Sequence, residues 1–446
     1  MTTTPSPSDD TSEVTVTQAL AYAVQLQQAN QLDAAELLYT RILEALPEQP
    51  DALHFLGVLQ HQRGHSDTAI ALIAQACTLI PNHPDCHINL GNVLADTGRL
   101  PEASTAYRRA LELDPERSDV FNNLGVVFKM LGRWEEAEAS YLRAIEISPD
   151  GTSAYNNLGL LHATRGRIKE AIHYYCLSIA KMPGHPDARR LLGIAYYTLG
   201  RTREAAEVFR QWREAEPDSP VARHMHAACS GEDVPERAAD DYVEQTFDRF
   251  ADSFDKQLQL NLAYRAPELV AEALARALPA GAAPLDILDA GCGTGLCGPL
   301  LRPLARRLSG ADLSGGMLAK AEARQCYDLL LKEELTAFMA ARPASFDAII
   351  SADTLVYFGA LEAVCTAARQ ALRPQGLFVF TVEQLPPGTD QTGFRINPHG
   401  RYAHGRDYLE SSLLAAGFSV RSIEAADLRN EGGEPVTGWV VTAAAP

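Results

Sequence analysis

The chain has 446 residues, more than one compact core usually organises, so two or more domains are expected. Its apolar fraction of 46% and its charged fraction of 22% are those of an ordinary globular protein. The formal net charge of −18 repels the phosphates of DNA and RNA, so no nucleic-acid partner is expected.

The eight cysteines stand singly, without the close pairs of a zinc site. No metal site is therefore predicted, and free thiols in a reducing, cytoplasmic compartment are expected. The first residues, MTTTPSPSDDTSE, lack both a basic start and an apolar stretch, so residues 1–15 are predicted to form a disordered leader and not a signal peptide. No apolar run reaches membrane-spanning length, which predicts a soluble protein without a membrane partner.

Several residue types recur every 34 residues between positions 16 and 219. Leu-Gly pairs begin at 56, 90, 124, 158 and 192, and a second glycine recurs as Gly64, Gly98, Gly132, Gly166 and Gly200. Alanine recurs at 35, 69, 103, 137, 171 and 205, an aromatic residue at 39, 107, 141, 175 and 209, and proline at 47, 81, 115, 149, 183 and 217. Such regularity indicates an array of like structural units.

A helix-turn-helix unit explains each series. Small residues let two antiparallel helices approach closely, and the aromatic side chain fills the gap that they leave. The second glycine takes the positive φ of the loop, and the proline ends the second helix. The pattern resembles the tetratricopeptide repeat, with six units over residues 16–219. The resemblance implies an α-helical superhelix whose concave face binds a protein or peptide.

Asparagine recurs two residues before the first glycine, as Asn89, Asn123 and Asn157. Because asparagine is a poor helix former, its recurrence on helices needs a reason. One interpretation is a ladder of amides that bond the backbone of an extended peptide, which resembles the repeats of O-linked N-acetylglucosamine transferases. The other is packing or bonding between adjacent repeats. The sequence leaves both open.

Beyond the repeats, residues 220–241 are predicted to form a linker, since they contain Pro235 and an acidic cluster. Residues 242–284 follow, with aromatic residues at helical spacing and an amphipathic helix at 266–278. The plain interpretation of the aromatic stripe is core packing. The segment also resembles the helical preface of small-molecule methyltransferases.

From residue 285 to residue 446, apolar strands alternate with helices. Strands are expected at 285–289, 308–312, 328–332, 346–351, 376–382, 417–424 and 436–443. This alternation predicts an α/β, Rossmann-like fold with a mostly parallel seven-stranded sheet and an antiparallel hairpin at its end. Ligands of such a sheet bind at the carboxyl ends of the strands.

The stretch Asp289-Ala-Gly-Cys-Gly-Thr-Gly295 follows the first of these strands and carries Gly291, Gly293 and Gly295. Shifted by two residues, it also fits the dinucleotide pattern G-x-G-x-x-G. A pyrophosphate needs amide donors and no nearby carboxylate, whereas the ammonium group of S-adenosylmethionine needs an acid at the turn. Asp289 therefore favours the methyl donor.

The run around Asp312, Leu313 and Met317 resembles the G-x-D-x-S-x-x-M-L-x-x-A run of class I S-adenosylmethionine-dependent methyltransferases. That resemblance implies that Asp312 binds the ribose hydroxyls and that Met317 flanks the adenine. Glu334, with Leu335 beside it, stands where the family's acid contacts the adenine amine, although family members more often have aspartate there. The whole chain most resembles predicted bacterial methyltransferases that carry amino-terminal tetratricopeptide repeats.

Candidates for the acceptor side follow the fourth strand, as Asp353 and Tyr357, and lie in residues 394–407. The second segment holds Arg395 and Arg401 as substrate contacts and His404 as a candidate base. The alternative is a solvated basic loop. The leading function is an S-adenosylmethionine-dependent methyltransferase whose repeats recruit a protein or peptide. A scaffold with a catalytically idle cofactor-binding domain is the alternative, and a nucleotide-dependent oxidoreductase comes third.

Overall fold

The computed structural model describes residues 15–183, 185–251, 264–279, 281–386, 388–390, 392–431 and 434–446. The chain divides into two compact units, Met1–Leu192 and Gly193–Pro446. The leader predicted at 1–15 lies outside the described residues, except for Thr15, whose side chain caps the first helix. Among the described helices, none is long and apolar enough to cross a membrane.

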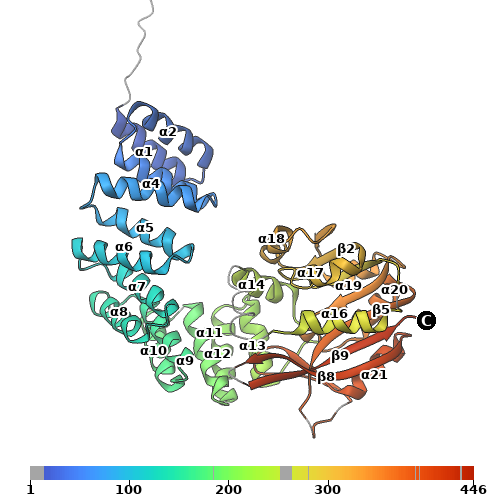
Figure 1. Cartoon of the computed structure of the whole chain (residues 1–446). Coiled ribbons are helices and arrows are strands. Elements are labelled where there is room, and N and C mark those ends of the chain that lie inside the picture. Colours follow the sequence, from blue (N-terminus) through green and yellow to red (C-terminus); the bar gives the residue numbers. More distant parts are fainter. Residues whose placement is uncertain are drawn as a thin grey trace, which may run out of the picture. The chain divides into compact units, whose positions relative to one another are not determined.

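Antiparallel helix pairs build the first unit (Figure 1). Its helices are α1 Val16–Gln28, α2 Leu32–Ala45, α3 Pro50–Gln62, α4 Ser66–Leu79, α5 Pro84–Asp96, α6 Leu100–Leu113, α7 Ser118–Met130, α8 Trp134–Ile147, α9 Thr152–Thr164 and α10 Ile168–Lys181. Helices α11 Pro186–Thr198 and α12 Thr202–Ala215 form a sixth pair.

The recurrent residues take the positions that the helix-turn-helix unit predicts. A Cβ atom added to Gly125 would lie 2.6 Å from the ring of Tyr141, so the glycine allows α7 and α8 to touch. Gly132 has a φ of 72° in the turn between them, a conformation that favours glycine. Helix α8 ends at Ile147, two residues before Pro149. Glycine and proline therefore fix the spacing and the length of each pair.

The structure differs from the linker predicted over residues 220–241. Helix α13, Pro220–Ser230, occupies the first half of that range and packs on α12. The Ser219 side chain accepts a hydrogen bond from the amide of Ala222, and Gly231 ends the helix with a φ of 75°. Helix α13 is part of the core and not a linker, since its His224 is only 5% exposed.

Helix α14, Asp240–Phe250, begins the predicted helical preface, and α16, Ala266–Ala277, confirms the amphipathic helix predicted there. The part of the preface at residues 252–263 lies outside the described residues.

A nine-stranded sheet forms the centre of the second unit. Its strands are β1 Leu285–Ala290, β2 Ala305–Asp312, β3 Leu329–Lys332, β4 Phe346–Ser351, β5 Leu372–Gln384, β6 Phe394–Ile396, β7 Tyr402–His404, β8 Ser419–Glu431 and β9 Glu434–Ala444. Between them lie α17 Gly298–Leu301, α18 Gly315–Ala323, α19 Leu335–Ala340, α20 Glu362–Ala371 and α21 Arg406–Ala415, with short 3-10 turns at Arg302–Leu304 and Leu355–Tyr357.

Parallel pairing gives the order β3-β2-β1-β4-β5, and β9 pairs antiparallel with both β5 and β8. The seven expected strands and the antiparallel hairpin are confirmed. The short hairpin β6–β7 adds two strands inside the segment that was expected to be loop-like.

Apolar residues of the sheet point alternately to its two faces. Leu288 and Phe378 pack on the face covered by α19, α20 and α21. Ile287 and Val379 pack on the opposite face, against α16. The order of the strands reverses between β1 and β4, since β2 lies on one side of β1 and β4 on the other. A crevice at the carboxyl ends of these two strands is where a ligand of such a sheet binds.

Candidate functional site

The glycine-rich turn after β1 has the backbone that the motif requires. Gly291, Gly293 and Gly295 have φ angles of 76°, 53° and 82°. A Cβ atom on Gly291 would lie 2.2 Å from the Thr354 side chain, so this glycine serves the contact between the turn and the end of β4. A Cβ atom on Gly293 would meet nothing within 4 Å. The space beside Gly293 is therefore open for a ligand to approach the backbone.

Asp289 is almost fully buried at the end of β1, with 1% of its surface exposed. The Tyr327 hydroxyl donates a hydrogen bond of 2.6 Å to its Oδ2 atom, while Oδ1 has no hydrogen-bond partner among the described residues. Burial raises the pKa of Asp289 to about 7. A buried carboxylate oxygen without a donor is costly, and it fits the ammonium group of an amino-acid ligand.

Asp312, at the end of β2, accepts backbone hydrogen bonds of 2.9 Å each from Gly293 and Ser314. It therefore joins the glycine turn to the start of α18, and burial raises its pKa. Leu313 is partly buried, while Met317 is 1% exposed in α18. The structure thus brings Asp289, Asp312 and the glycines together, and it buries Met317 in the core beside them.

Helix α14 contacts this region through Asp248, which the sequence did not single out. Its Oδ1 atom accepts hydrogen bonds from the Ser314 hydroxyl at 2.5 Å and from the Gly316 amide at 3.1 Å. The bond from Ser314 lowers the pKa of Asp248. The helical preface is therefore fastened to the first turn of α18.

Glu334 stands at the amino end of α19, where its carboxylate accepts hydrogen bonds from the amides of Thr336 and Ala337 at 3.0 and 2.8 Å. This is a helix cap, which gives the residue a structural role of its own. Leu335 is buried in the core. The contact between Glu334 and an adenine amine stays a prediction.

On the acceptor side, Asp353 follows β4 with a φ of 53°, which is uncommon for a residue other than glycine. Its amide donates to the Thr381 hydroxyl at 2.8 Å, and its neighbour Thr354 donates to the carbonyl of Gly291 at 3.1 Å. The residue next to Asp353 therefore contacts the glycine turn. Tyr357 is partly exposed, its ring packs edge-on against Phe247 at 5.4 Å, and burial raises its pKa.

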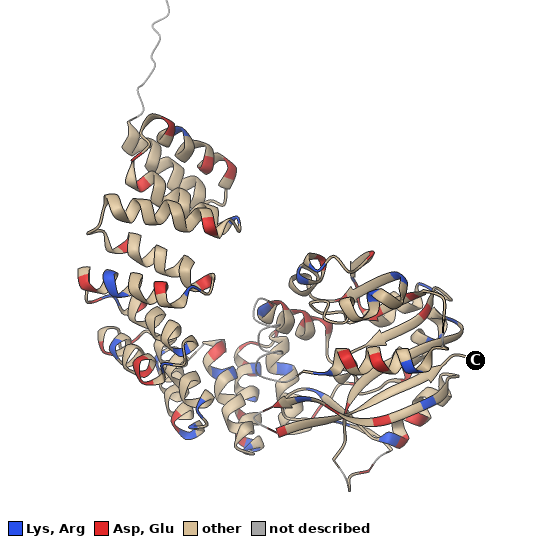
Figure 2. Cartoon of the chain, viewed as in Figure 1, with Lys and Arg blue, Asp and Glu red and all other residues tan. Residues whose placement is uncertain are grey.

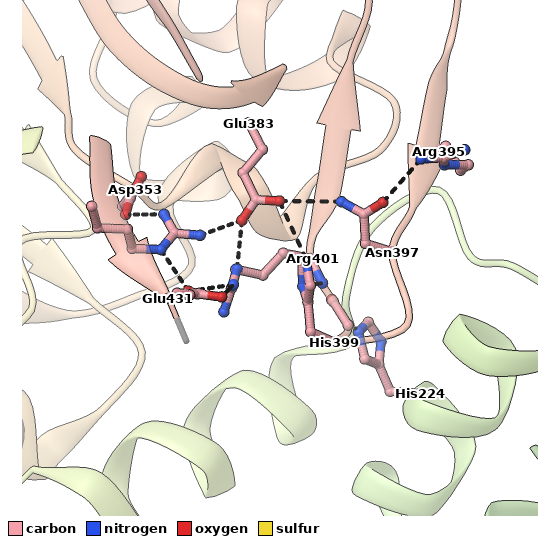
Figure 3. Close-up of polar contacts among 10 residues, drawn as sticks. His224, Asp353, Glu383, Arg395, Asn397, His399, Arg401 and Glu431 are labelled. Atoms are coloured by element: carbon pink, nitrogen blue, oxygen red, sulfur yellow. Dashed lines mark hydrogen bonds and ion pairs between the residues drawn. The ribbon is translucent and has the colours of Figure 1, made fainter. Parts of the chain in front are cut away.

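Asp353 belongs to a group of ion pairs, the acid–arginine cluster, made of Asp353, Glu383, Arg401, Arg429 and Glu431 (Figure 3). Arg429 on β8 donates to Asp353 at 2.6 Å, to Glu431 at 2.7 Å and to Glu383. Arg401 donates to Glu383 at 2.6 Å and to Glu431 at 2.5 Å. Every arm of Arg429 is thus used by a carboxylate.

The cluster keeps the carboxylates of Glu383 and Glu431 ionised. Burial acts to raise the pKa of Glu431, but Arg401 and Arg429 outweigh it and lower that pKa to about 2. Glu383 is 3% exposed, and the same two arginines, with His399, keep its pKa low despite burial. Burial lowers the pKa of His399 to about 4, so this ring is neutral at pH 7.

The other two residues expected on the acceptor side, His404 and Arg395, are not members of the acid–arginine cluster. His404 has no exposed surface, and its Nε2 atom contacts the carbonyl oxygen of Gly359 at 3.1 Å. Burial lowers its pKa to about 4, so it is a weak base without access to solvent. Arg395 is exposed on β6 and contacts only the Asn397 side chain at 3.4 Å among the described residues. Their catalytic and substrate roles stay predictions, and the burial of His404 does not favour its role.

In the repeats, the asparagine positions make side-chain hydrogen bonds between neighbouring units. Asn89 contacts His54 at 2.8 Å, and Asn123 and Asn157 donate to Asn92 and Asn122 at 3.3 and 2.9 Å. These contacts match bonding between adjacent repeats. Contact with a peptide stays a prediction for these three positions.

Tyr264 lies just before α16. Burial raises the pKa of its hydroxyl, and the charges of Asp353 and Asp289 add to the effect. A lone tyrosine before a helix, like Tyr327 before β3, carries no motif that would have identified it in the sequence.

The comparisons with known proteins concern parts of the chain. Residues 288–380 match the family model of a methyltransferase domain. Models of the tetratricopeptide repeat match residues 88–152, 131–186 and 162–229, and the model of anaphase-promoting complex, cyclosome, subunit 3 matches residues 28–110.

Human methyltransferase-like protein 27 is 42% identical over 85 residues, which are 19% of this chain and 34% of that protein. The chain thus spans about a third of the length of this curated relative.

Two solved structures resemble part of the chain. PilW, a widely conserved type IV pilus biogenesis factor, is 20% identical, with a TM-score of 0.42 over 46% of this chain and 95% of its own. YrrB, a tetratricopeptide-repeat protein with an unusual peptide-binding site, is 25% identical, with a TM-score of 0.34 over 42% of this chain and 96% of its own. Both TM-scores are too low to relate function.

Proposed function

We propose that this chain, which joins tetratricopeptide repeats to a methyltransferase domain, transfers a methyl group from S-adenosylmethionine to an acceptor that the repeats help to recruit. One observation carries the proposal: Asp289 presents a buried, unpartnered carboxylate oxygen at the glycine turn, close to the open space at Gly293. The unpartnered oxygen and the open space together suit a ligand that carries an ammonium group and lies along the backbone of the turn.

Each group has a role in this proposal. Asp289 accepts the ammonium group of the methyl donor, and Asp312 keeps lone pairs free for ribose hydroxyls beyond the backbone bonds that it accepts. When bound, S-adenosylmethionine supplies an activated methyl group on a sulfonium. The protein then contributes alignment of the acceptor and exclusion of water.

A dinucleotide fits the same turn less well. Its pyrophosphate would approach the Asp289 carboxylate, which Tyr327 holds at the turn. The negative charges of the pyrophosphate and of the Asp289 carboxylate would repel each other, so a nicotinamide cofactor is disfavoured.

The test is calorimetric titration of the full chain with S-adenosylmethionine and, separately, with NAD. Binding of the methyl donor alone, lost in Asp289→Ala and Asp312→Ala, is expected. NAD binding without methyl-donor binding would overturn the proposal. Binding of the methyl donor without transfer to any acceptor in a cell extract would favour a scaffold with an idle domain.

The proposed recruiting surface includes Asn89, Asn123 and Asn157. An asparagine side chain can make up to four hydrogen bonds, and the contacts between repeats use one for each of these residues. Donors and acceptors therefore remain for a peptide backbone. A photo-crosslinking residue at position 123 should capture a partner, whereas the same residue at Arg143, exposed on α8, should not.

A further inference from the structure

The acid–arginine cluster carries an excess negative charge beside the proposed methyl-donor site. Its three carboxylates belong to Asp353, Glu383 and Glu431, and its two guanidinium groups belong to Arg401 and Arg429. His399, which lies 3.5 Å from Glu383, is neutral at pH 7. One negative charge is therefore left without a counterion inside the cluster.

That charge is best placed on Asp353. Both guanidinium groups bond the Glu383 and Glu431 carboxylates, whereas Asp353 receives only Arg429, through Oδ2. Among the described residues, its Oδ1 atom has only a long contact of 3.4 Å with the Thr381 hydroxyl. Asp353 therefore keeps acceptor capacity that the cluster does not use.

Asp353 is also held in one orientation. Its left-handed backbone is fixed by the bond from its amide to Thr381, and its side chain is fixed by Arg429. A strained residue that several contacts hold in place is typical of a functional site. The neighbouring Thr354 touches the glycine turn, where Asp289 has its unpartnered buried oxygen, so a group bound at Asp353 would lie next to the methyl donor.

The proposed acceptor site next to Asp353 also includes an aromatic ring. The Tyr357 ring follows Asp353 by four residues and packs against Phe247. Aromatic faces next to a carboxylate attract organic cations, whereas an anionic acceptor would meet the excess negative charge.

We propose that the methyl acceptor is an amine, which Asp353 holds next to Tyr357. The inference rests on the proposed methyl transfer and adds the class of substrate. A bound ammonium group first loses a proton to water. The nitrogen lone pair then forms the N–C bond while the S–C bond breaks, and the electron pair of that bond returns to sulfur.

This transfer suits the charge of the site. The positive charge that leaves sulfur reappears on nitrogen, next to Asp353, so the carboxylate stabilises charge as it develops. A carboxylate acceptor would gain nothing from Asp353 and would be repelled by it. An amine on a free small molecule and the side-chain amine of a lysine share this chemistry.

The test measures binding of n-hexylamine, 1-hexanol and hexanoate to the full chain saturated with S-adenosylhomocysteine. The amine should bind about fivefold more tightly than either other probe. Asp353→Asn should remove that preference, since asparagine tolerates the left-handed backbone and can still accept from Arg429 but carries no charge. Glu424→Gln, which alters an exposed carboxylate on β8, should keep it.

Equal or tighter binding of hexanoate would overturn the proposal, and so would a preference that survives in Asp353→Asn with an unchanged circular dichroism spectrum. If the chain binds no S-adenosylhomocysteine, the proposed function fails, and the same three probes then test the amine preference on the unloaded chain. A peptide with one lysine, compared with its ε-acetylated form and with n-hexylamine, distinguishes the two sources of the amine.

Discussion

At the scale of single residues, Asp289 is a residue whose ionised form is destabilised by burial in the folded chain. Its pKa rises from about 4 to about 7, so ionising it inside the fold costs on the order of 2–4 kcal/mol. Between pH 4 and pH 7 the folded state binds the proton of the Asp289 carboxyl more tightly than the unfolded state does. The cost therefore grows as the pH rises from 4 to 7, and it is fully present above pH 7.

We predict that Asp289→Asn raises the melting temperature at pH 8 and leaves it nearly unchanged at pH 4. The amide is neutral and its oxygen still accepts from the Tyr327 hydroxyl. The same variant should lose at least about tenfold in affinity for S-adenosylmethionine, because the charged acceptor is gone. Thermal unfolding and calorimetry at both pH values measure the two effects.

Asp286, on the same strand, is the matched control. Its carboxylate pairs with Arg306 at 2.6 Å and with Arg373 at 2.9 Å, and these partners lower its pKa. Asp286→Asn should therefore destabilise the chain at pH 8 and leave the affinity for the methyl donor intact. A melting temperature that falls in both variants would contradict the account of Asp289.

A second prediction concerns Gly293, whose missing side chain leaves open space. In Gly293→Ala the backbone keeps its positive φ at a cost of about 1–2 kcal/mol, since no atom within 4 Å obstructs the methyl group. The methyl group would occupy the space proposed for the methyl donor. The variant should therefore fold, as circular dichroism would show, and bind S-adenosylmethionine at least about tenfold more weakly.

Gly315→Ala serves as its control, because Gly315 also has open space and lies at the start of α18 without a positive φ. It should bind the methyl donor as the unaltered chain does. Undiminished binding by a folded Gly293→Ala would show that no ligand lies along the turn at that residue.

The sequence could predict only those site residues that lie close together along the chain. Asp289 and the three glycines share a turn, and Asp312 ends the next strand, so strand order was enough to place them. Tyr327 reaches Asp289 across 38 residues and Arg429 reaches Asp353 across 76. No local pattern encodes such contacts, because they depend on side-chain packing between elements that are distant in the sequence.

At the scale of elements, the repeats differ in whether the tyrosine hydroxyl on the second helix of the unit has a hydrogen-bond partner. The Tyr107 hydroxyl donates to Asn92 at 2.7 Å. One repeat later, Val126 stands where Asn92 stood, and the buried Tyr141 hydroxyl has no partner among the described residues. Tyr107 and Tyr141 hold equivalent positions, but only the hydroxyl of Tyr107 makes a hydrogen bond among the described residues.

We predict that Tyr141→Phe stabilises the repeats by about 1 kcal/mol, because it removes a buried donor that bonds nothing. Tyr107→Phe should instead destabilise them by about 1 kcal/mol, because it breaks the bond to Asn92. Urea unfolding of the full chain, followed by circular dichroism, compares the two. Each variant is the control of the other, since both delete one hydroxyl from a fully packed ring. Equal destabilisation would mean that Tyr141 has a partner after all.

Elements with a strong period were predictable, and those held by tertiary contacts were not. The 34-residue period fixed the helices of the repeats because each glycine and proline acts within its own unit. Helix α13 was missed because its burial depends on tertiary contacts, such as that of the His224 ring with the Gly400 carbonyl oxygen at 2.7 Å, far along the chain. Strands β6 and β7 have three residues each, too few for a period to be seen.

At the scale of the whole molecule, charge has a consequence for the rate at which an acceptor is captured. Acidic and basic residues are interspersed over the helices and strands of both units, but the acidic ones are in excess, with a net charge of −18 (Figure 2). Such a chain attracts cations over a distance, and dissolved salt screens the attraction. If the acceptor is an amine on a peptide, the whole chain and the acid–arginine cluster act in the same direction.

We therefore predict that kcat/KM for a lysine peptide falls severalfold between about 20 and about 300 mM salt, while kcat changes little, because screening acts on encounter and not on the bound complex. The slope should depend on the charge of the acceptor. It should be steep for Arg-Lys-Arg, shallow for Ala-Lys-Ala and reversed for Glu-Lys-Glu, all capped at both ends. Measuring initial rates at several salt concentrations gives the three slopes. If they are equal, long-range attraction plays no part in capture, and the cluster acts on the acceptor only after it has entered the site.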